Sequence, residues 1–262
     1  MKEILSYYLR KNNNVIIETL KEHIDEAIKI VNKIEYSPIL RYAKRISPNL
    51  KNFGKLINLA IVFHDSGKAF FQEDKIENKE YLSFRGHEFF SSYIFKSFCK
   101  ECKANFTFEE NYGINDYELI NFAILFHHHS MNIMKRLNEF SFKPQYKIQW
   151  IEKLYESLNP FLTEDYKVFL KFTINNIIKD FKRENAIALI KEDIKLELKN
   201  IWENIWYDRN RKKLSLIILT ILIVSDNIAA QNKRGEAQAR NVFHMALEDF
   251  YNFYLVKPQC RI

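Results

Sequence analysis

The stretch that most constrains the fold is LAIVFHDSGK, residues 59–68. Its first half has the apolar character of a buried helix, and His64 and Asp65 follow directly. Imidazole and carboxylate groups both bind metals, and a carboxylate has two oxygens, so Asp65 could link a metal on His64 to a second metal. Gly67 is the predicted helix stop, and Lys68 lies one turn beyond His64, where it could meet a phosphate oxygen. A His-Asp pair also occurs by chance, so it needs support elsewhere in the chain.

The end of this stretch, Ser-Gly-Lys, resembles part of a nucleotide-binding loop. A Walker A loop needs glycine five positions before its Gly-Lys and serine or threonine directly after it. Val62 and Ala69 occupy those positions. The sequence therefore excludes a P-loop nucleoside triphosphatase.

Apolar residues recur at helical spacing in almost all of the remaining chain. Five glycines and five prolines in 262 residues are too few for the turns of a β-sandwich or barrel. Helices are predicted over 15–34 and from starts at Ser47–Pro48, Gly86, Asp116 and Asn159–Pro160, and the polar stretches 182–185 and 209–213 separate the later ones. Without repeats or flexible linkers, residues 1–262 are expected to form one all-α domain.

The apolar share of 47% is ample for a sizeable core, and the net charge of +7 suits an anionic partner such as nucleic acid. Three cysteines cannot form a disulfide framework, which favours the reducing cytoplasm. Cys99 and Cys102 have the spacing of a zinc or redox pair, but only Cys260 remains as a further thiol ligand. Two small, partly buried residues on a helix are the preferred interpretation.

No membrane segment is expected from the sequence. The N-terminus lacks the apolar stretch and cleavage site of a signal peptide. The most apolar run, Leu214–Val224, is far short of the roughly 20 residues that cross a bilayer, so it predicts a buried core helix.

Three further polar groups interrupt or end apolar helices. His87, in Gly-His-Glu at 86–88, stands at a predicted helix start; AILFHHHS at 123–130 ends a helix in three histidines; Asp226 follows the most apolar run. A buried carboxylate without a partner is destabilising by several kcal/mol, so Asp226 needs a metal or a cation. Each feature alone is as compatible with a structural role as with metal binding. Their occurrence in one chain favours a metal site.

The order of these motifs resembles the HD-domain metal-dependent phosphohydrolases. His-Asp-x-x-Lys, Gly-His-Glu, a helix ending in His-His, and Ser-Asp followed by small residues are similar to the CRISPR-associated HD nucleases of type I interference systems. His23, in LKEHIDEA at 20–27, matches the histidine that an early helix contributes in that family. The resemblance covers about residues 20 to 230 and implies a single helical HD bundle.

The resemblance implies two metals with a shared ligand. It assigns one metal to His23, His64, Asp65 and Asp226, and the second to Asp65, His87, His127 and His128, and it gives Lys68 the role of neutralising charge on the scissile phosphate. The family usually has His-His-Gly where this chain has His-His-His-Ser, so a register one residue later would use His128 and His129 instead. His244 matches no family position.

The implied activity is hydrolysis of phosphodiester bonds in single-stranded DNA, with RNA as a second substrate, during CRISPR interference. Two metals roughly 3.5–4 Å apart stabilise both oxygens of an in-line displacement. Mixed imidazole and carboxylate ligands favour Mn²⁺, Fe²⁺, Co²⁺ or Ni²⁺, and Mg²⁺ remains compatible. The implied partners are a separate helicase and a crRNA-guided surveillance complex. A basic rim around the pocket is expected to follow the nucleic-acid backbone.

Two other functions compete with the nuclease. An HD phosphohydrolase acting on small nucleotides, either a dNTPase or a cyclic-nucleotide phosphodiesterase, would share the same core motifs. A metal-free helical adaptor that binds nucleic acid or protein would need none of them. The residues from 131 to 211 carry no recognisable chemistry and are candidates for a substrate channel or a docking surface.

Overall fold

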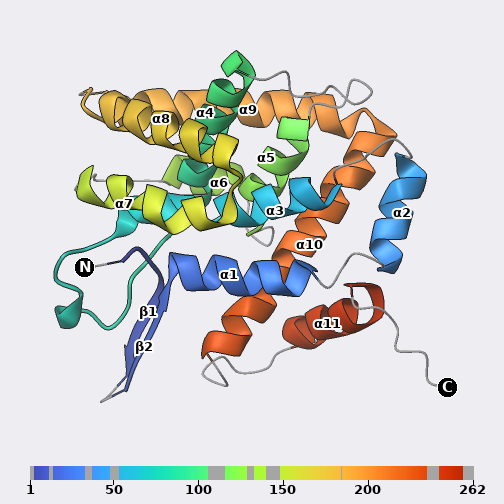
Figure 1. The fold of residues 1–262 in the computed structure, drawn as a ribbon, viewed down its shortest axis with the longest axis horizontal. Helices are drawn as coiled ribbons and strands as arrows, with labels where there is room; N and C mark the ends of the chain where they lie inside the picture. Colours follow the sequence, from blue (N-terminus) through green and yellow to red (C-terminus); the bar gives the residue numbers. More distant parts are fainter. Residues whose placement is uncertain are drawn as a thin grey trace.

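The structure, a computed structural model, describes residues 3–11, 14–32, 37–47, 53–105, 116–128, 133–139, 148–183, 185–234 and 242–255. These residues form an antiparallel hairpin and a set of α-helices with short 3₁₀ segments between some of them and a π-helical turn, η6, after the last (Figure 1). The elements are β1 (Leu5–Lys11), β2 (Asn14–Thr19), α1 (Leu20–Val31), α2 (Pro38–Ile46), α3 (Phe53–Phe63), η2 (Ser66–Phe71), η3 (Ile76–Asn78), α4 (His87–Asn105), α5 (Asp116–Phe126), α6 (Ile133–Glu139), α7 (Ile148–Leu158), η4 (Asn159–Phe161), α8 (Glu164–Phe181), α9 (Ala186–Trp206), α10 (Arg209–Arg234), α11 (Val242–Phe250) and η6 (Tyr251–Leu255).

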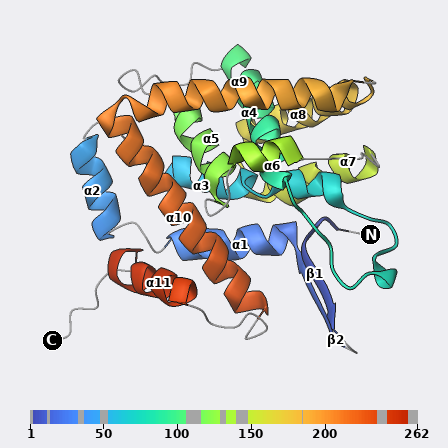
Figure 2. The same ribbon diagram turned by 180° about the vertical axis from the view of Figure 1, so that it is seen from behind.

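The helices surround a central group made of α3, α4 and α5. Helix α10 crosses the molecule diagonally and packs against α1, α3 and α5, while α8 and α9 lie along the opposite side from α1 (Figures 1 and 2). The hairpin β1–β2 extends from the N-terminal end of α1. The all-α fold class predicted from the sequence is confirmed.

Helix α10 is a core helix, as its sequence predicts. Its 26 residues are long and apolar enough to cross a membrane by length and composition alone. However, 67% of its most apolar window is buried inside the fold. Leu214, Ile218 and Ile221 are fully buried, so the apolar surface of α10 is used for packing against the other helices.

The first predicted helix is shorter than expected, because residues from Val15 to Thr19 form strand β2 and not helix. Thr19 has an extended backbone (φ −80°, ψ 156°), and its hydroxyl accepts a hydrogen bond from the N–H of Glu22 at 3.2 Å. The Glu22 carboxylate in turn accepts from the Thr19 N–H at 3.0 Å. This capping box begins α1 at Leu20 and leaves the preceding residues free to pair with β1.

A second helix start was predicted at Ser47–Pro48, at the edge of the described residues. Ser47 is the C-cap of α2, since its N–H continues the helix by donating to the carbonyl of Ala43 at 3.0 Å; Pro48 lies outside the described residues. Another Ser-Pro pair, Ser37–Pro38, starts α2, and the Ser37 hydroxyl accepts from the Leu40 N–H at 3.3 Å.

Two later boundaries also differ from the prediction. Asn159 and Pro160 form the short 3₁₀ segment η4, and α8 begins only after Thr163. The basic stretch 209–213 does not separate helices but forms the first turns of α10. It is helical because the carboxylate of Asp208 accepts from the N–H groups of Asn210 and Arg211, both at 2.8 Å.

The remaining helix predictions are confirmed. Helix α4 begins directly after Gly86, α5 begins at Asp116, and the polar stretch 182–185 separates α8 from α9. Cys99 and Cys102 are buried on α4, as the structural interpretation requires. Cys260 lies outside the described residues.

Candidate metal centre

The His-Asp pair occupies the turn between α3 and η2. The His64 N–H still donates to Ala60 at 2.9 Å, as in the last turn of a helix, and the Lys68 N–H donates to the Asp65 carbonyl at 2.9 Å. The side chains of His64, Asp65 and Lys68 are all buried at this turn. An apolar helix that ends inside the protein therefore presents three polar groups to its interior.

Gly67 is not the helix stop that the sequence suggested. Helix α3 ends at Phe63, and Gly67 lies within η2, where its N–H donates to the hydroxyl of Ser91 at 2.8 Å. The described glycine with positive φ is Gly86, at 92°, directly before α4. Gly67 is required because a Cβ atom at this position would clash with backbone atoms in the first turns of α4.

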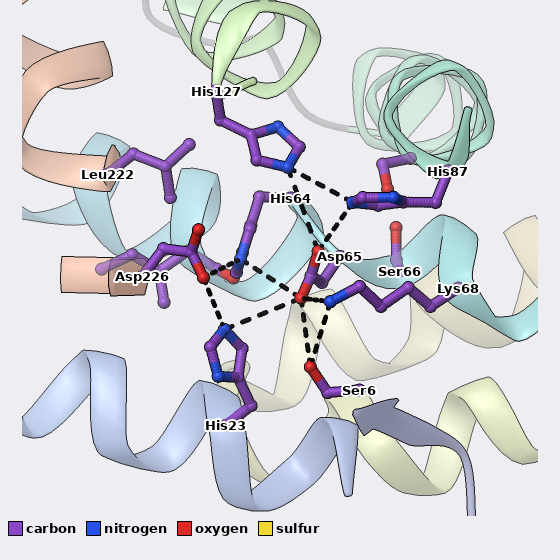
Figure 3. A network of polar contacts seen from close by, with 12 residues as sticks. Ser6, His23, His64, Asp65, Ser66, Lys68, His87, His127, Leu222 and Asp226 are labelled. Carbon is purple, nitrogen blue, oxygen red and sulfur yellow. Dashed lines mark hydrogen bonds and ion pairs between the residues drawn. The ribbon is translucent and has the colours of Figure 1, made fainter. Parts of the chain in front are cut away.

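The first of two clusters brings together His23 from α1, His64, Asp65 and Asp226 from α10 (Figure 3). One ligand atom from each residue lies within 4.8 Å of the others. His23 Nε2 is 2.9 Å from Asp226 Oδ1 and 3.6 Å from Asp65 Oδ2. His64 Nε2 is 3.5 Å from Asp65 Oδ2 and 3.7 Å from Asp226 Oδ1. We call these four residues the first cluster.

The second cluster consists of His87 at the start of α4 and His127 and His128 directly after α5. The Nε2 atom of His87 is 3.3 Å from that of His127 and 3.4 Å from that of His128. Three imidazoles from two helix ends thus converge on one point beside the first cluster.

Asp65 connects the two clusters through its two carboxylate oxygens. Oδ2 faces His23 and His64, while Oδ1 is 2.9 Å from His87 Nε2 and 4.0 Å from His127 Nε2. Burial alone would raise the pKa of Asp65, but His64, Lys68 and His87 outweigh it and hold the pKa well below its usual range. The carboxylate is therefore charged and has one oxygen for each cluster.

The tautomers of three histidines leave Nε2 available as a ligand atom. Nδ1 of His64, His87 and His127 donates to the carbonyl three residues earlier, at 2.7, 2.7 and 2.6 Å. Because a carbonyl can only accept, the neutral rings carry the proton on Nδ1 and a lone pair on Nε2. His64 Nε2 is buried without a hydrogen-bond partner. A divalent cation would satisfy these converging lone pairs, so the residues present fit a metal.

Electrostatics keeps two histidines of the second cluster, His127 and His128, in the form that binds metals. Burial and the neighbouring histidines lower the pKa of His127 well below its usual value and that of His128 to about 3. Both rings are neutral at physiological pH, as metal ligands must be. For His23, burial would lower the pKa, but hydrogen bonds to Asp226 and Glu18 raise it to about 9.

Lys68 and Ser6 complete the polar centre on the side of the hairpin (Figure 3). Lys68 Nζ donates to Asp65 Oδ2 at 2.5 Å and to the Ser6 hydroxyl at 3.1 Å. Ser6 in turn donates to Asp65 Oδ2 at 3.3 Å. Gln72 fixes β1 beside the centre, since its side chain bonds the backbone N–H and carbonyl of Leu5 at 3.0 and 2.9 Å.

The structure brings together all eight residues predicted for the site: His23, His64, Asp65, Lys68, His87, His127, His128 and Asp226. Their roles as ligands stay predictions. His129 lies outside the described residues, and His244 is on α11, in neither cluster. Ser6, Glu18 and Gln72 were not predicted from the sequence. Glu18 lay within a segment predicted to be helical, and Ser6 and Gln72 lay outside the motifs that indicated a site.

The choice between the two histidine registers is testable with a matched pair of variants. Because His127 Nε2 faces both His87 and Asp65, we expect His127→Ala to weaken binding of one of two Mn²⁺ ions by roughly 100-fold or more. His129→Ala is expected to leave both affinities unchanged. Isothermal titration with Mn²⁺ measures both. The reverse result, loss in His129→Ala alone, would establish the later register.

The model of the HD domain family matches residues 39–169, which is half of the chain. The chain therefore belongs to the HD domain family. HD domains are hydrolases that depend on divalent metals, in agreement with the donor set found here. No curated protein matches the chain.

A solved structure similar to this chain is the CRISPR-associated Cas3 HD domain protein MJ0384 from Methanocaldococcus jannaschii. The two are 19% identical, and the match covers 86% of this chain and all of the other, with a TM-score of 0.39.

Proposed function

We propose that this HD-domain protein is a nuclease that hydrolyses phosphodiester bonds in single-stranded DNA, with RNA as a second substrate. The observation that carries the proposal is the carboxylate of Asp65, which offers Oδ2 to one cluster and Oδ1 to the other. A carboxylate shared in this way suits a pair of metals held close together, the arrangement that serves in-line displacement at phosphorus.

Two bound divalent ions would supply Lewis acidity at the attacking and leaving oxygens and lower the pKa of bound water. Under this proposal His23, His64, Asp65 and Asp226 hold one ion, and Asp65, His87, His127 and His128 hold the other. The imidazole-rich second cluster favours Mn²⁺, Fe²⁺, Co²⁺ or Ni²⁺, and the two carboxylates of the first cluster remain compatible with Mg²⁺. Five of these seven side chains, all except His128 and Asp226, are buried, which limits reorganisation during reaction.

Lys68 is proposed to neutralise charge on the scissile phosphate. Its ammonium group lies beside the shared carboxylate and has limited exposure, so a phosphate bound at the metals would lie within its reach. Lys68→Met is expected to lower kcat on single-stranded DNA by about 100-fold while two Mn²⁺ ions still bind. Steady-state kinetics beside a metal titration separates the two effects. An unchanged kcat, or loss of a metal, would contradict this role.

The proposed setting is CRISPR interference in the cytoplasm, with a separate helicase and a crRNA-guided surveillance complex as partners. This setting is supported by the order of motifs from His23 through His64-Asp65-x-x-Lys68 to Asp226, which resembles the CRISPR-associated HD nucleases. The net charge of +7 is consistent with an anionic polymer as substrate.

One experiment separates the nuclease from the competing functions. Purified protein with Mn²⁺ is incubated with labelled single-stranded DNA, with RNA, and with a panel of dNTPs and cyclic nucleotides. Shortening of the DNA, abolished by a chelator and restored by Mn²⁺, supports the nuclease. Release of phosphate or nucleoside from free nucleotides with intact DNA would establish the small-nucleotide phosphohydrolase. A protein that binds no metal would fit the adaptor.

A further inference from the structure

Glu18 is a buried carboxylate on the far side of a metal-cluster histidine. It is 1% exposed, and its Oε1 accepts a hydrogen bond from His23 Nδ1 at 3.1 Å. Its Oε2 accepts from Arg234 through Nε at 3.0 Å and Nη2 at 2.7 Å. An unbroken chain of contacts therefore runs from Arg234 through Glu18 and His23 to Asp226.

The hairpin is the reason that Glu18 points inward. In strand β2, side chains alternate between the two faces, so Ile17 is 46% exposed whereas Glu18 is buried. The chain enters α1 at Leu20, and His23 lies on the buried face of that helix. Arg234 ends α10, about two turns beyond Asp226 on the same helix. One helix thus carries both a candidate metal ligand and the group that anchors Glu18.

His23 differs from three of the other clustered histidines in what holds its ring. Nδ1 of His64, His87 and His127 donates to a neutral backbone carbonyl, whereas Nδ1 of His23 donates to a carboxylate. A carboxylate behind a metal-bound imidazole fixes the tautomer and makes the ring a stronger ligand. The guanidinium of Arg234, with two hydrogen bonds, offsets the penalty for burying the charge of Glu18.

We propose that Glu18, held by Arg234, is a positioning residue that raises the affinity of the first cluster for its metal and has no effect on the second cluster. The inference rests on the two-metal part of the proposed function, since it needs a metal on His23. Glu18 contacts no substrate and acts only through the orientation and basicity of the His23 ring.

The test is Mn²⁺ titration of Glu18→Gln by isothermal calorimetry. Glutamine has the same shape but lacks the charge, so we expect the affinity of one of the two Mn²⁺ ions to fall about 10- to 100-fold while the other is unchanged. The matched control is Glu22→Gln, in the next turn, whose half-exposed carboxylate pairs with Lys233 at 3.0 Å. Glutamine also suits its place in the capping box, so this control should bind both ions as the parent does.

Combining Glu18→Gln with a variant that disrupts one cluster shows which Mn²⁺ ion depends on Glu18. In His87→Ala, which retains the complete first cluster, Glu18→Gln should again lower the Mn²⁺ affinity by the same factor. In His23→Ala the same change should have no effect, because the ring through which Glu18 acts is gone. Equal weakening of both ions, or weakening that persists without His23, would mean a general structural role and would overturn the proposal.

Arg234 provides a second route should Glu18→Gln fold poorly. Arg234→Lys keeps a cation beside Glu18 and should retain most of the Mn²⁺ affinity, whereas Arg234→Gln should weaken the same ion that depends on Glu18. Parent-like binding in Arg234→Gln and Glu18→Gln would refute the inference. If the parent binds two Mn²⁺ ions and the variants lose Mn²⁺ affinity as expected, but the parent does not cleave DNA, the nuclease proposal fails and the role of Glu18 stands.

Discussion

Replacing Asp65 with asparagine is expected to weaken the binding of both metal ions at once and to abolish measurable hydrolysis. Oδ2 of Asp65 faces His23 and His64, and Oδ1 faces His87, so no other described side chain serves both clusters. Asparagine keeps the shape but removes the charge that attracts both cations. Activity on single-stranded DNA should fall by about 10³-fold or more, since losing one donor that stabilises a transition state already lowers kcat by ~10²–10³-fold.

The measurement is Mn²⁺ stoichiometry and affinity beside a cleavage assay, with Asp25→Asn as the control. Asp25 is half exposed on α1 and pairs with Lys29, so its loss should affect neither readout. A variant at Asp65 that still binds two Mn²⁺ ions with parent affinity would remove the basis for a shared carboxylate. Loss of one ion only would show that Asp65 serves a single cluster.

The parts of the site that the sequence predicted lie at the ends of apolar helices. Helix α3 ends at Phe63 and α5 at Phe126, and in each case histidines follow directly. An apolar helix that must be buried brings the residues after it to the interior, so their burial could be inferred locally. That His23 and Asp226 meet them could not, because no local rule relates residues so far apart. That expectation came from the resemblance in motif order.

The hairpin was not predicted because the spacing of apolar residues across its second strand and the following helix is that of a single helix. Ile16, Leu20 and Ile24 recur every four residues, as in a helix, although Ile16 belongs to β2 and the other two to α1. Strand pairing is non-local, so nothing within this segment revealed β1 as its partner. The groups that the hairpin contributes, Ser6 and Glu18, were missed for the same reason. The clustered histidines and carboxylates were therefore predictable, whereas the residues that support them required the three-dimensional structure.

The second large effect is expected for Gly67→Ala, which alters the backbone packing beneath the site. A Cβ atom at Gly67 would lie 2.1 Å from the carbonyl oxygen of His87, 2.7 Å from the backbone N of Ser91 and 2.9 Å from Cβ of Phe90. Two of these atoms belong to the backbone of α4 and cannot rotate away. The helix must shift, and we expect a loss of about 3 kcal/mol in the free energy of unfolding, or roughly 6–12 °C in Tm.

The same shift reaches the metals because His87 is the first residue of α4. Moving His87 changes the 2.9 Å contact between its Nε2 and Asp65 Oδ1. Gly67→Ala should therefore lower the Mn²⁺ affinity of the second cluster more than that of the first. Gly54→Ala is the control: a Cβ there meets nothing within 4 Å, and alanine in a helix should preserve or slightly raise Tm. A parent-like Tm and Mn²⁺ titration for Gly67→Ala would show that α4 does not press on this turn, and the close approach would then not be what requires glycine.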